Sequence, residues 1–264
     1  MAPKKQVPTG KSTAIVPWDQ KFASAAREAK AQVKNVGSGV NVRFGRGSIT
    51  VGGVDVPGGK LPCVIVGSCA LNAWYEGLYD PNDIQPPVCY AFAEVVGDEE
   101  MAPHEKAAKP QNDLCATCEK NQFGTAETGR GKACGNNVRL GLLTAKDVAD
   151  ADLIPTAELV TAKVSTTNVK NFAGYVKMLA DEYNRPPWAV VTEISSHDDK
   201  NTQIRLEFKM VELIDDDDTL AALEKRTEPV QEVLQTPFAP AAERPAKQSN
   251  VGRGSKFASK GVRR

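Results

Sequence analysis

Four cysteines between positions 89 and 134 are the residues of this chain whose types and spacing could do chemistry. Cys115 and Cys118 form a C-x2-C pair, and Cys134 follows at the end of a run of Gly, Arg and Lys residues. Two thiolates in one tight turn can bind a metal ion that a third thiolate then helps to enclose. Cys89 is the expected fourth ligand, with His104 as the reserve. The sequence therefore predicts a tetrahedral site in which four cysteines bind structural Zn2+.

Other uses of these cysteines remain open, namely free thiols, an iron–sulfur centre or redox chemistry. A thioredoxin-type pair would need a βαβ context, which the sequence does not provide. A catalytic zinc ion usually has His or carboxylate ligands and an open position, whereas a set of four cysteines is closed. No signal peptide precedes the chain, so we expect a cytoplasmic protein without disulfides. Cys63 and Cys69 lie in an apolar run and are expected to be buried thiols.

Groups suited to acid–base or nucleophilic catalysis are scarce. The chain has only 2 His and no G-x-S-x-G motif. The Gly10-Lys11-Ser12 tripeptide lacks the earlier glycine and the preceding strand of a phosphate-binding P-loop. The four aspartates at 215–218 are expected to cap a helix. We therefore predict that the protein is not an enzyme.

Aromatic residues gather on both sides of the Pro86-Pro87 pair. Some of these rings should pack in the core, while the others could form a platform on which unpaired bases stack, each base contributing on the order of 1–3 kcal/mol. The candidates for stacking are Trp74, Tyr75, Tyr79 and Tyr90. Basic residues that could follow the phosphate backbone are Arg43, Arg46, Arg130, Lys132 and Arg139. The glycines around Arg130 and Lys132 are equally explained by a turn that lets Cys134 reach the metal.

The charge is unevenly distributed although the formal net charge is +0. Residues 1–16 and 237–264 are rich in Lys or Arg and poor in large apolar side chains, so we predict two disordered basic arms. The part between them carries the compensating excess of Asp and Glu, and its acidic stretch 212–232 could contact replication or recombination proteins. No apolar run is long enough for a transmembrane helix.

The pattern of apolar residues and turns predicts one β-rich core domain over 17–236. Helices are predicted over 19–33, 169–183 and after 215–218, and strands over 40–44, 48–51, 63–66, 158–164, 188–194 and 203–210. The buried face of the helix 169–183 should hold Val169, Phe172, Val176, Leu179 and Tyr183. The first two strands should form a hairpin through a turn at 45–47, and the last two should be antiparallel neighbours across a polar loop at 197–201. The long irregular region 86–140 is expected to be an insertion that needs a metal to hold its shape.

The layout of the chain resembles that of bacteriophage single-stranded DNA-binding proteins: a strand-rich body, a Cys-rich insertion with aromatic residues beside it, a basic N-terminal arm and an acidic stretch near the C-terminal side. Three motifs also resemble a pattern of phage proteins of similar length. They are the Pro-Pro-Val-Cys-Tyr-Ala segment 86–91, the Met-Ala-Pro-His segment 101–104 and the block from Cys115 to Cys134 with its Phe-Gly and Gly-Lys-Ala-Cys elements. The T4-type members of this family are OB-fold proteins with zinc in a subdomain beside the barrel. This chain departs from them in offering four Cys rather than His with three Cys, and in having a basic tail after its acidic stretch.

Together, the residues and the resemblance predict an α+β protein. Its centre would be an antiparallel, β-rich, OB-like barrel with flanking helices, a zinc-stabilised Cys-rich insertion and disordered basic termini. The expected function is binding of single-stranded DNA, without strong sequence specificity, in phage-type replication or recombination. The alternative is a zinc-stabilised protein–protein adaptor or structural factor without affinity for nucleic acid.

Overall fold

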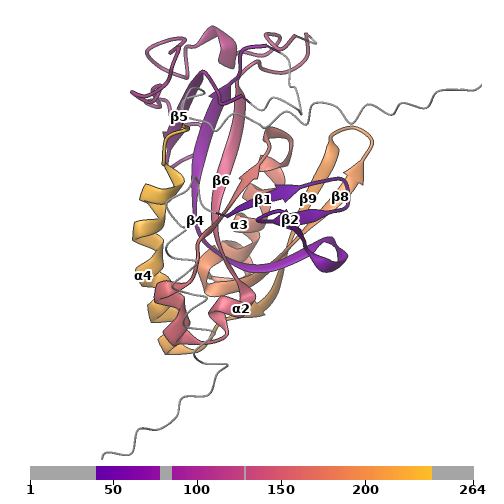
Figure 1. The fold of residues 1–264 in the computed structure, drawn as a ribbon, viewed down its shortest axis with the longest axis vertical. Coiled ribbons are helices and arrows are strands. Elements are labelled where there is room, and N and C mark those ends of the chain that lie inside the picture. The colour runs from indigo at the N-terminus through magenta and orange to yellow at the C-terminus, as the bar shows by residue number, and fades with distance from the viewer. Residues whose placement is uncertain (1–39, 78–84, 128, 240–264) are drawn as a thin grey trace, which may run out of the picture.

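The computed structural model describes residues 40–77, 85–127 and 129–239. The predicted helix 19–33, the greater part of both predicted arms and Tyr79 lie outside the described residues. Within them, the chain is a mixed α+β fold built on one curled sheet that forms a half-barrel (Figure 1).

The sheet has nine strands in the order β3-β2-β1-β7-β6-β4-β8-β9, and β5 pairs with β4 beside this path. The strands are β1 Asn41–Phe44, β2 Ile49–Val51, β3 Val54–Asp55, β4 Lys60–Trp74, β5 Cys89–Ala93, β6 Gly135–Thr144, β7 Val160–Val164, β8 Val190–Asp199 and β9 Gln203–Leu213. All pairs are antiparallel except β1 with β7, where Asn41 lies opposite Thr161. The expected β1–β2 hairpin is confirmed, as is the antiparallel β8–β9 pair.

Strand β4 is the central element, and it is much longer than the predicted strand 63–66. It pairs first with β8, then with β6 along most of its length, and finally with β5. Its two faces contribute to different apolar clusters, with Cys63 and Ile65 in one and Val64 and Val66 in the other. Because both faces are covered, the strand appears as a continuous apolar run rather than an alternating one.

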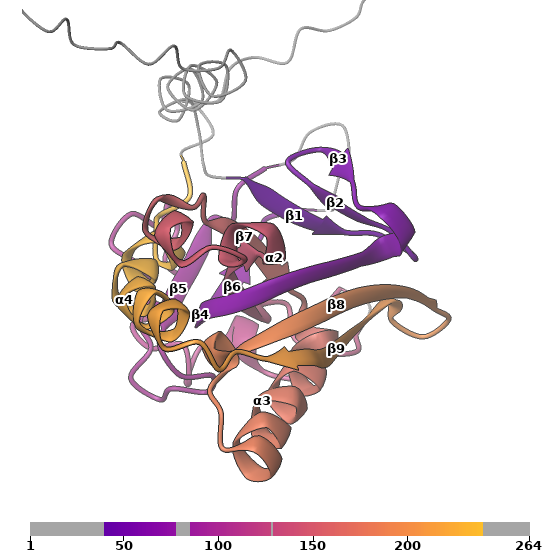
Figure 2. The same ribbon diagram turned by 90° about the horizontal axis from the view of Figure 1, so that it is seen from below.

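Two long helices cover opposite faces of the sheet (Figure 2). The longer helices are α3 Val169–Tyr183 and α4 Asp217–Leu234, and α2 Ala145–Val148 is a single turn. The 3-10 segments are η1 Pro57–Gly59, η2 Glu119–Asn121, η3 Ala151–Thr156, η4 Thr166–Asn168 and η5 Pro187–Ala189. Among the described residues, no helix combines the length and apolar character that crossing a membrane requires.

Helix α3 has the predicted range and, except at Tyr183, the predicted face. Phe172, Tyr175 and Leu179 are its buried residues, Val169 and Val176 pack partly buried against the same cluster, and Tyr183 is 39% exposed. The prediction that Tyr183 lies on the buried face was therefore wrong, and Tyr175 was missed. The Tyr175 hydroxyl shares a hydrogen bond of 2.6 Å with Thr192 Oγ1, which satisfies its polar end in the core.

Helix α4 packs closely on β4 and β6 because glycines leave room for it. A Cβ added to Gly67 would lie 2.6 Å from Val230 Cγ1, and one added to Gly141 would lie 2.8 Å from the same atom. The carboxylate of Asp216 accepts a hydrogen bond of 2.8 Å from the Thr219 amide, so the predicted acidic cap is confirmed. The helix itself extends through most of the acidic stretch 212–232.

The region predicted to be an irregular insertion, 86–140, has a different organisation. Its first part includes β5 and its last part includes the beginning of β6, both of which belong to the main sheet. The irregular segment is therefore confined to residues 94–134, which lie beyond the upper ends of β4, β5 and β6 in Figure 1.

Candidate functional site

The ends of three adjacent strands position two of the four candidate cysteines. Cys89 is the first residue of β5 and lies opposite Trp74, the last residue of β4. Cys134 immediately precedes β6, whose first residue, Gly135, lies opposite Ala73. Two residues that are far apart in the sequence therefore meet at one end of the sheet.

The irregular segment brings the other two cysteines to the same place. The Cys118 amide donates to the Cys115 carbonyl over 3.4 Å, and the Asn121 amide donates to the Cys118 carbonyl over 3.0 Å. The Asn121 side-chain amide also donates to the Cys115 carbonyl, over 2.8 Å. The Cys134 amide donates to the Lys120 carbonyl over 2.7 Å, so this turn is attached directly to the chain that enters β6.

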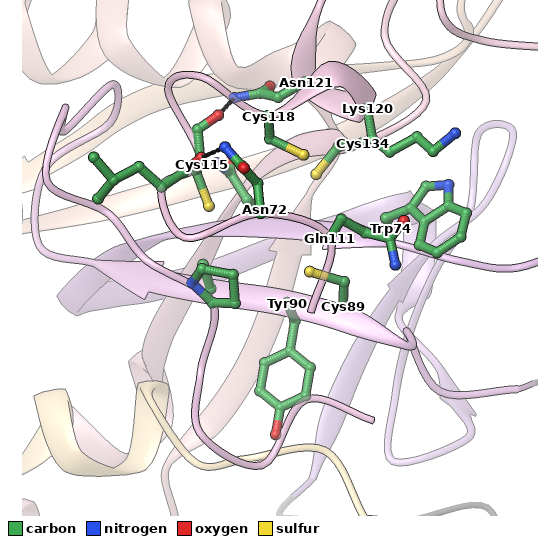
Figure 3. A pocket seen from close by; sticks show the side chains of 14 residues that line it. Asn72, Trp74, Cys89, Tyr90, Gln111, Cys115, Cys118, Lys120, Asn121 and Cys134 are labelled. Atoms are coloured by element: carbon green, nitrogen blue, oxygen red, sulfur yellow. Dashed lines mark hydrogen bonds between the residues drawn. The ribbon is translucent and has the colours of Figure 1, made fainter. Parts of the chain in front are cut away.

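Cys89, Cys115, Cys118 and Cys134 line one small pocket. Each is at most 9% exposed, and all are free thiols. Figure 3 shows the sulfur atoms of Cys118 and Cys134 turned towards each other, with Cys89 on the strand below. As the side chains stand, no group of three or more His, Cys, Asp or Glu residues in the described part of the chain is arranged to hold a metal ion.

Burial and mutual repulsion disfavour ionisation of these thiols. Desolvation is the main cause that raises the pKa of Cys134 to about 12, and repulsion from the thiolates of the other three cysteines adds to it. Desolvation likewise raises the pKa of Cys89 and of Cys115. Hydrogen bonds act in the opposite direction, from the Gln111 backbone to Cys89 and from the Ala73 backbone to Cys134. Backbone amides therefore donate hydrogen bonds to two of the sulfur atoms. The one ammonium group in the pocket lining, that of Lys120, cannot neutralise the negative charge of four thiolates.

His104, the reserve ligand, does not line this pocket. Its Nδ1 accepts a hydrogen bond of 3.0 Å from the Lys106 amide. Its ring stacks on Tyr90 with a centroid distance of 5.2 Å and meets Phe92 edge-on at 5.9 Å. The structure therefore gives His104 a packing role and places Cys89 beside the other three thiols.

Cys63 and Cys69 are buried thiols, as expected. They are 1% and 0% exposed, respectively. Burial raises the pKa of Cys63 to about 12, and it raises the pKa of Cys69 to about 11 against the opposing effect of Arg139. Both remain protonated at neutral pH.

Two of the predicted nucleic-acid contacts have partners within the fold. Tyr90 is 2% exposed, so its ring offers no face to a base. The guanidinium of the half-buried Arg139 lies 4.9 Å from the centroid of Phe92 and 4.8 Å from that of Phe238. It also donates hydrogen bonds of 2.7 and 3.0 Å to the carbonyls of Leu234 and Thr236. Arg139 thus attaches the end of α4 to the sheet, and composition alone could not predict these partners because they are distant in sequence.

Three other rings lie at the cysteine end of the sheet, each with a lysine ammonium over it. Lys120 Nζ lies 5.6 Å from the centroid of Trp74, Lys163 Nζ lies 5.9 Å from that of Tyr75, and Lys132 Nζ lies 5.4 Å from that of Phe123. Phe123 is 83% exposed and Tyr75 is 40% exposed, while Trp74 is half-buried. We refer to these three ring–lysine pairs collectively as the ring–ammonium surface: Trp74 and Tyr75 are consecutive at the end of β4, and Phe123 lies in the cysteine segment.

Half of this surface, namely Phe123, Lys120 and Lys163, was not predicted from the sequence. Phe123 and Lys120 stand inside the cysteine segment, where the placement of an aromatic residue and a cation between candidate metal ligands was a usable signal. Lys163 is on β7, and only the fold brings it to Tyr75. Although the residue is exposed as a whole, desolvation and then repulsion from Arg139 lower the pKa of its ammonium.

The remaining predicted cations are divided between two regions. Arg130 is exposed in the cysteine segment, close in sequence to the half-buried Lys132. Arg43 and Arg46 are exposed on the β1–β2 hairpin, whose strand β1 pairs with β7. Arg46 forms an ion pair of 3.7 Å with Asp198. Arg43 follows Val42, which pairs with Ala162, so it lies next to Lys163 of the ring–ammonium surface.

Comparison with known proteins gives no match for this arrangement. The chain shows no significant match to any protein-family model, curated protein or solved structure. Functional interpretation therefore depends on the residues and geometry of the site itself.

Proposed function

We propose that the protein binds single-stranded DNA through the ring–ammonium surface, with the curled, OB-like sheet as its support. The observation that carries this proposal is the repeated pairing of a ring with an ammonium group, at Trp74–Lys120, Tyr75–Lys163 and Phe123–Lys132. Bases of any sequence stack on aromatic rings, and cations beside the rings can contact phosphates. Such a protein would protect or present single strands during replication or recombination.

The acidic average charge of the central region does not oppose this proposal. Phosphates respond to charge within about 8–10 Å at physiological ionic strength, so the local arrangement matters more than the sum. Lys120, Lys132 and Arg130 lie close together in the sequence of the cysteine segment, and Lys163 is added by β7. The cysteine segment 94–134 as a whole holds eight Asp or Glu and five Lys or Arg, so the proposal relies on the lysines beside the rings rather than on a basic segment.

The four clustered thiols support the further proposal that Cys89, Cys115, Cys118 and Cys134 hold structural Zn2+. A set of four cysteines suits tetrahedral zinc, in which each Zn–S bond is about 2.3 Å long. Reaching that geometry requires rotation of the cysteine side chains, whose backbone already surrounds one pocket. The cation would neutralise the thiolate charges that otherwise repel each other. The backbone amides that donate to Cys89 and Cys134 would stabilise the metal-bound thiolates.

The role of this zinc ion would be architectural. In the irregular segment, the described residues 94–127 and 129–134 form no strand and only the short 3-10 segment η2. No ladder of backbone hydrogen bonds therefore holds this part of the chain in shape. A metal bound to cysteines along this segment would hold Phe123, Lys120 and Lys132 in position.

A fluorescence titration with oligo(dT) tests the main proposal, and two tyrosines provide a matched pair of variants. Tyr75 is 40% exposed on the ring–ammonium surface, and Tyr183 is 39% exposed at the end of α3. We expect the wild type to bind with an affinity that falls steeply as salt is added. Tyr75→Ala should weaken binding roughly fivefold or more, while Tyr183→Ala should leave it unchanged.

Three results would contradict the proposal: no affinity for oligo(dT), an affinity indifferent to salt, or equal effects of the two tyrosine variants. Absence of DNA binding together with specific co-purification of a protein would instead favour the adaptor function.

A further inference from the structure

A second cavity, of about 350 Å3, opens beside the cysteine pocket and shares only part of its lining. This volume lies in the range of pockets that hold small molecules. Its lining combines apolar side chains with carboxamides, and it also includes the Asp98 carboxylate, the Cys115 thiol and the Lys132 ammonium. The apolar members used in the argument are Ala70, Val96 and Met101, and the carboxamides are Asn72, Asn136 and Asn137. We call this cavity the amide pocket.

The amides in this pocket are held in place by one another. The Asn136 Nδ2 group donates to Asn72 Oδ1 and, over 3.0 Å, to Asn121 Oδ1. Asn137 Nδ2 donates to the Gly135 carbonyl over 2.9 Å. A carboxamide has an acceptor oxygen and a donor –NH2 group. When hydrogen bonds hold the –NH2 group in place, the oxygen points in a defined direction. Asn72 and Asn137 are each only 9% exposed, so these orientations are built into the fold.

Lys132 joins the amide pocket to the ring–ammonium surface. Its ammonium donates to Asn121 Oδ1 over 3.1 Å and lies 5.4 Å from the centroid of Phe123. The same side chain also lines the amide pocket. A strand stacked on Phe123 would therefore pass the opening of the pocket with a phosphate near this ammonium.

A pocket with apolar walls and amide edges matches the chemistry of an unstacked nucleobase. The faces of a base are apolar and polarisable, and its edge carries adjacent hydrogen-bond donors and acceptors. Proteins recognise unpaired bases by packing against the faces and by hydrogen bonding to the edge. Because the Nδ2 groups of Asn136 and Asn137 already donate within the fold, these side chains present acceptor oxygens, which suit the exocyclic amine or ring N–H on the edge of a base.

We infer that the amide pocket takes one unstacked base of the bound strand and gives the protein a preference among bases. This inference rests on the proposed function, because it requires a strand to be bound at the neighbouring surface. The sequence predicted binding without strong sequence specificity. With this pocket, the rings would stack on any base, and one position of the strand would be selected by base type.

The test compares the affinities of oligo(dT), oligo(dA) and oligo(dC) of equal length for the full chain. Each well-made set of hydrogen bonds to a base edge typically provides about fivefold or greater discrimination. We expect the wild type to show such a ratio between the best and the poorest oligonucleotide. Asn136→Ala should reduce the ratio to about twofold or less while leaving affinity for the poorest oligonucleotide unchanged.

Two further variants keep this test independent of folding. Val96 is 54% exposed and lines the pocket, so Val96→Trp should obstruct the cavity without disturbing the core and should also abolish the preference. Asn201, an exposed residue in the β8–β9 turn, provides the control Asn201→Ala, which should keep the full ratio. Thermal unfolding of all variants identifies any that are destabilised.

The outcomes separate the two proposals. Salt-sensitive binding of all three oligonucleotides with equal affinity, or an unchanged ratio in both Asn136→Ala and Val96→Trp, overturns the base-selecting pocket and leaves the proposed function standing. Absence of binding to every oligonucleotide overturns both. A ratio that is lost in Asn201→Ala as fully as in the pocket variants would place the selection elsewhere, and would also overturn the inference.

Discussion

The two ends of β4 are held in place by different kinds of interaction. Near its beginning and middle, the strand is covered by apolar side chains on both faces, and Gly67 lets α4 approach so closely that no Cβ fits. At its other end, smaller apolar clusters around Ala70 and Leu71 are joined by thiols, carboxamides and the irregular segment 94–134. The first end is stabilised by burial of apolar surface, which needs no partner. The second combines small apolar clusters with polar groups that must each be satisfied, and this is the end that we propose binds zinc and DNA.

The largest expected effect at the cysteine end comes from removing one proposed ligand. Cys118→Ser should lower the zinc content from about one ion per chain to near zero, because the remaining three thiolates leave the tetrahedral set incomplete. The matched control is Cys63→Ala, which removes a buried thiol from the apolar end and should keep the metal. Elemental analysis of the purified proteins measures both. Equal zinc content in the two variants would contradict the proposal that these cysteines bind zinc.

At the apolar end, a large-to-small substitution should destabilise the whole fold without affecting metal. Leu140 on β6 is 0% exposed in the cluster that α3 covers. Leu140→Ala should lower the free energy of unfolding by about 2–5 kcal/mol, since it removes apolar contacts and leaves a cavity. Denaturant unfolding provides the measurement, with zinc content as the second readout. A loss of zinc from the folded variant would mean that the two ends are not independent.

A smaller effect, confined to binding, is expected at Phe123. The ring is 83% exposed, so it contributes little to folding. Phe123→Ala should weaken oligo(dT) binding by about 1–3 kcal/mol through loss of one stacking platform, with an unchanged midpoint of thermal unfolding. The conservative variant Phe123→Trp should restore affinity. If Phe123→Ala binds like the wild type, this ring is not part of the interface.

The smallest effect concerns the cap of α4. Hydrogen bonds from the Thr219 side chain and backbone lower the pKa of Asp216. A carboxyl group with a pKa lowered by folding stabilises the protein above its ordinary pKa, and this contribution is lost as the pH falls through the lowered value. Thermal melts between neutral and acidic pH should therefore show a slightly smaller acid-induced loss for Asp216→Asn than for the wild type. An identical pH dependence would show that the cap is energetically unimportant.

Features set by interactions between residues close in sequence were predicted correctly, whereas features set by distant parts of the chain were not. The β1–β2 hairpin, α3 and the Asp216 cap were predicted correctly because glycine turns, helical periodicity and capping act over a few residues. The full length of β4 was missed because its second half is buried by β5 and the cysteine segment, and that environment is set by distant parts of the chain. The surroundings of Tyr90 and Arg139 could not be predicted for the same reason, since their ring and backbone partners include residues from 234 onwards.

By itself, the sequence determined the local elements, the two buried thiols of β4 and the set of four cysteines suited to one metal ion. Those features depend on residue type and short spacing. Only the tertiary structure decided that Cys89, rather than His104, lies beside the other three thiols, and that Lys163 rather than Arg139 accompanies an exposed ring. It also created the amide pocket, because the pairing of β4 with β6 places Asn72 next to Asn136. Sheet pairing joins residues that the sequence separates by dozens of positions, and no local pattern encodes which of them will meet.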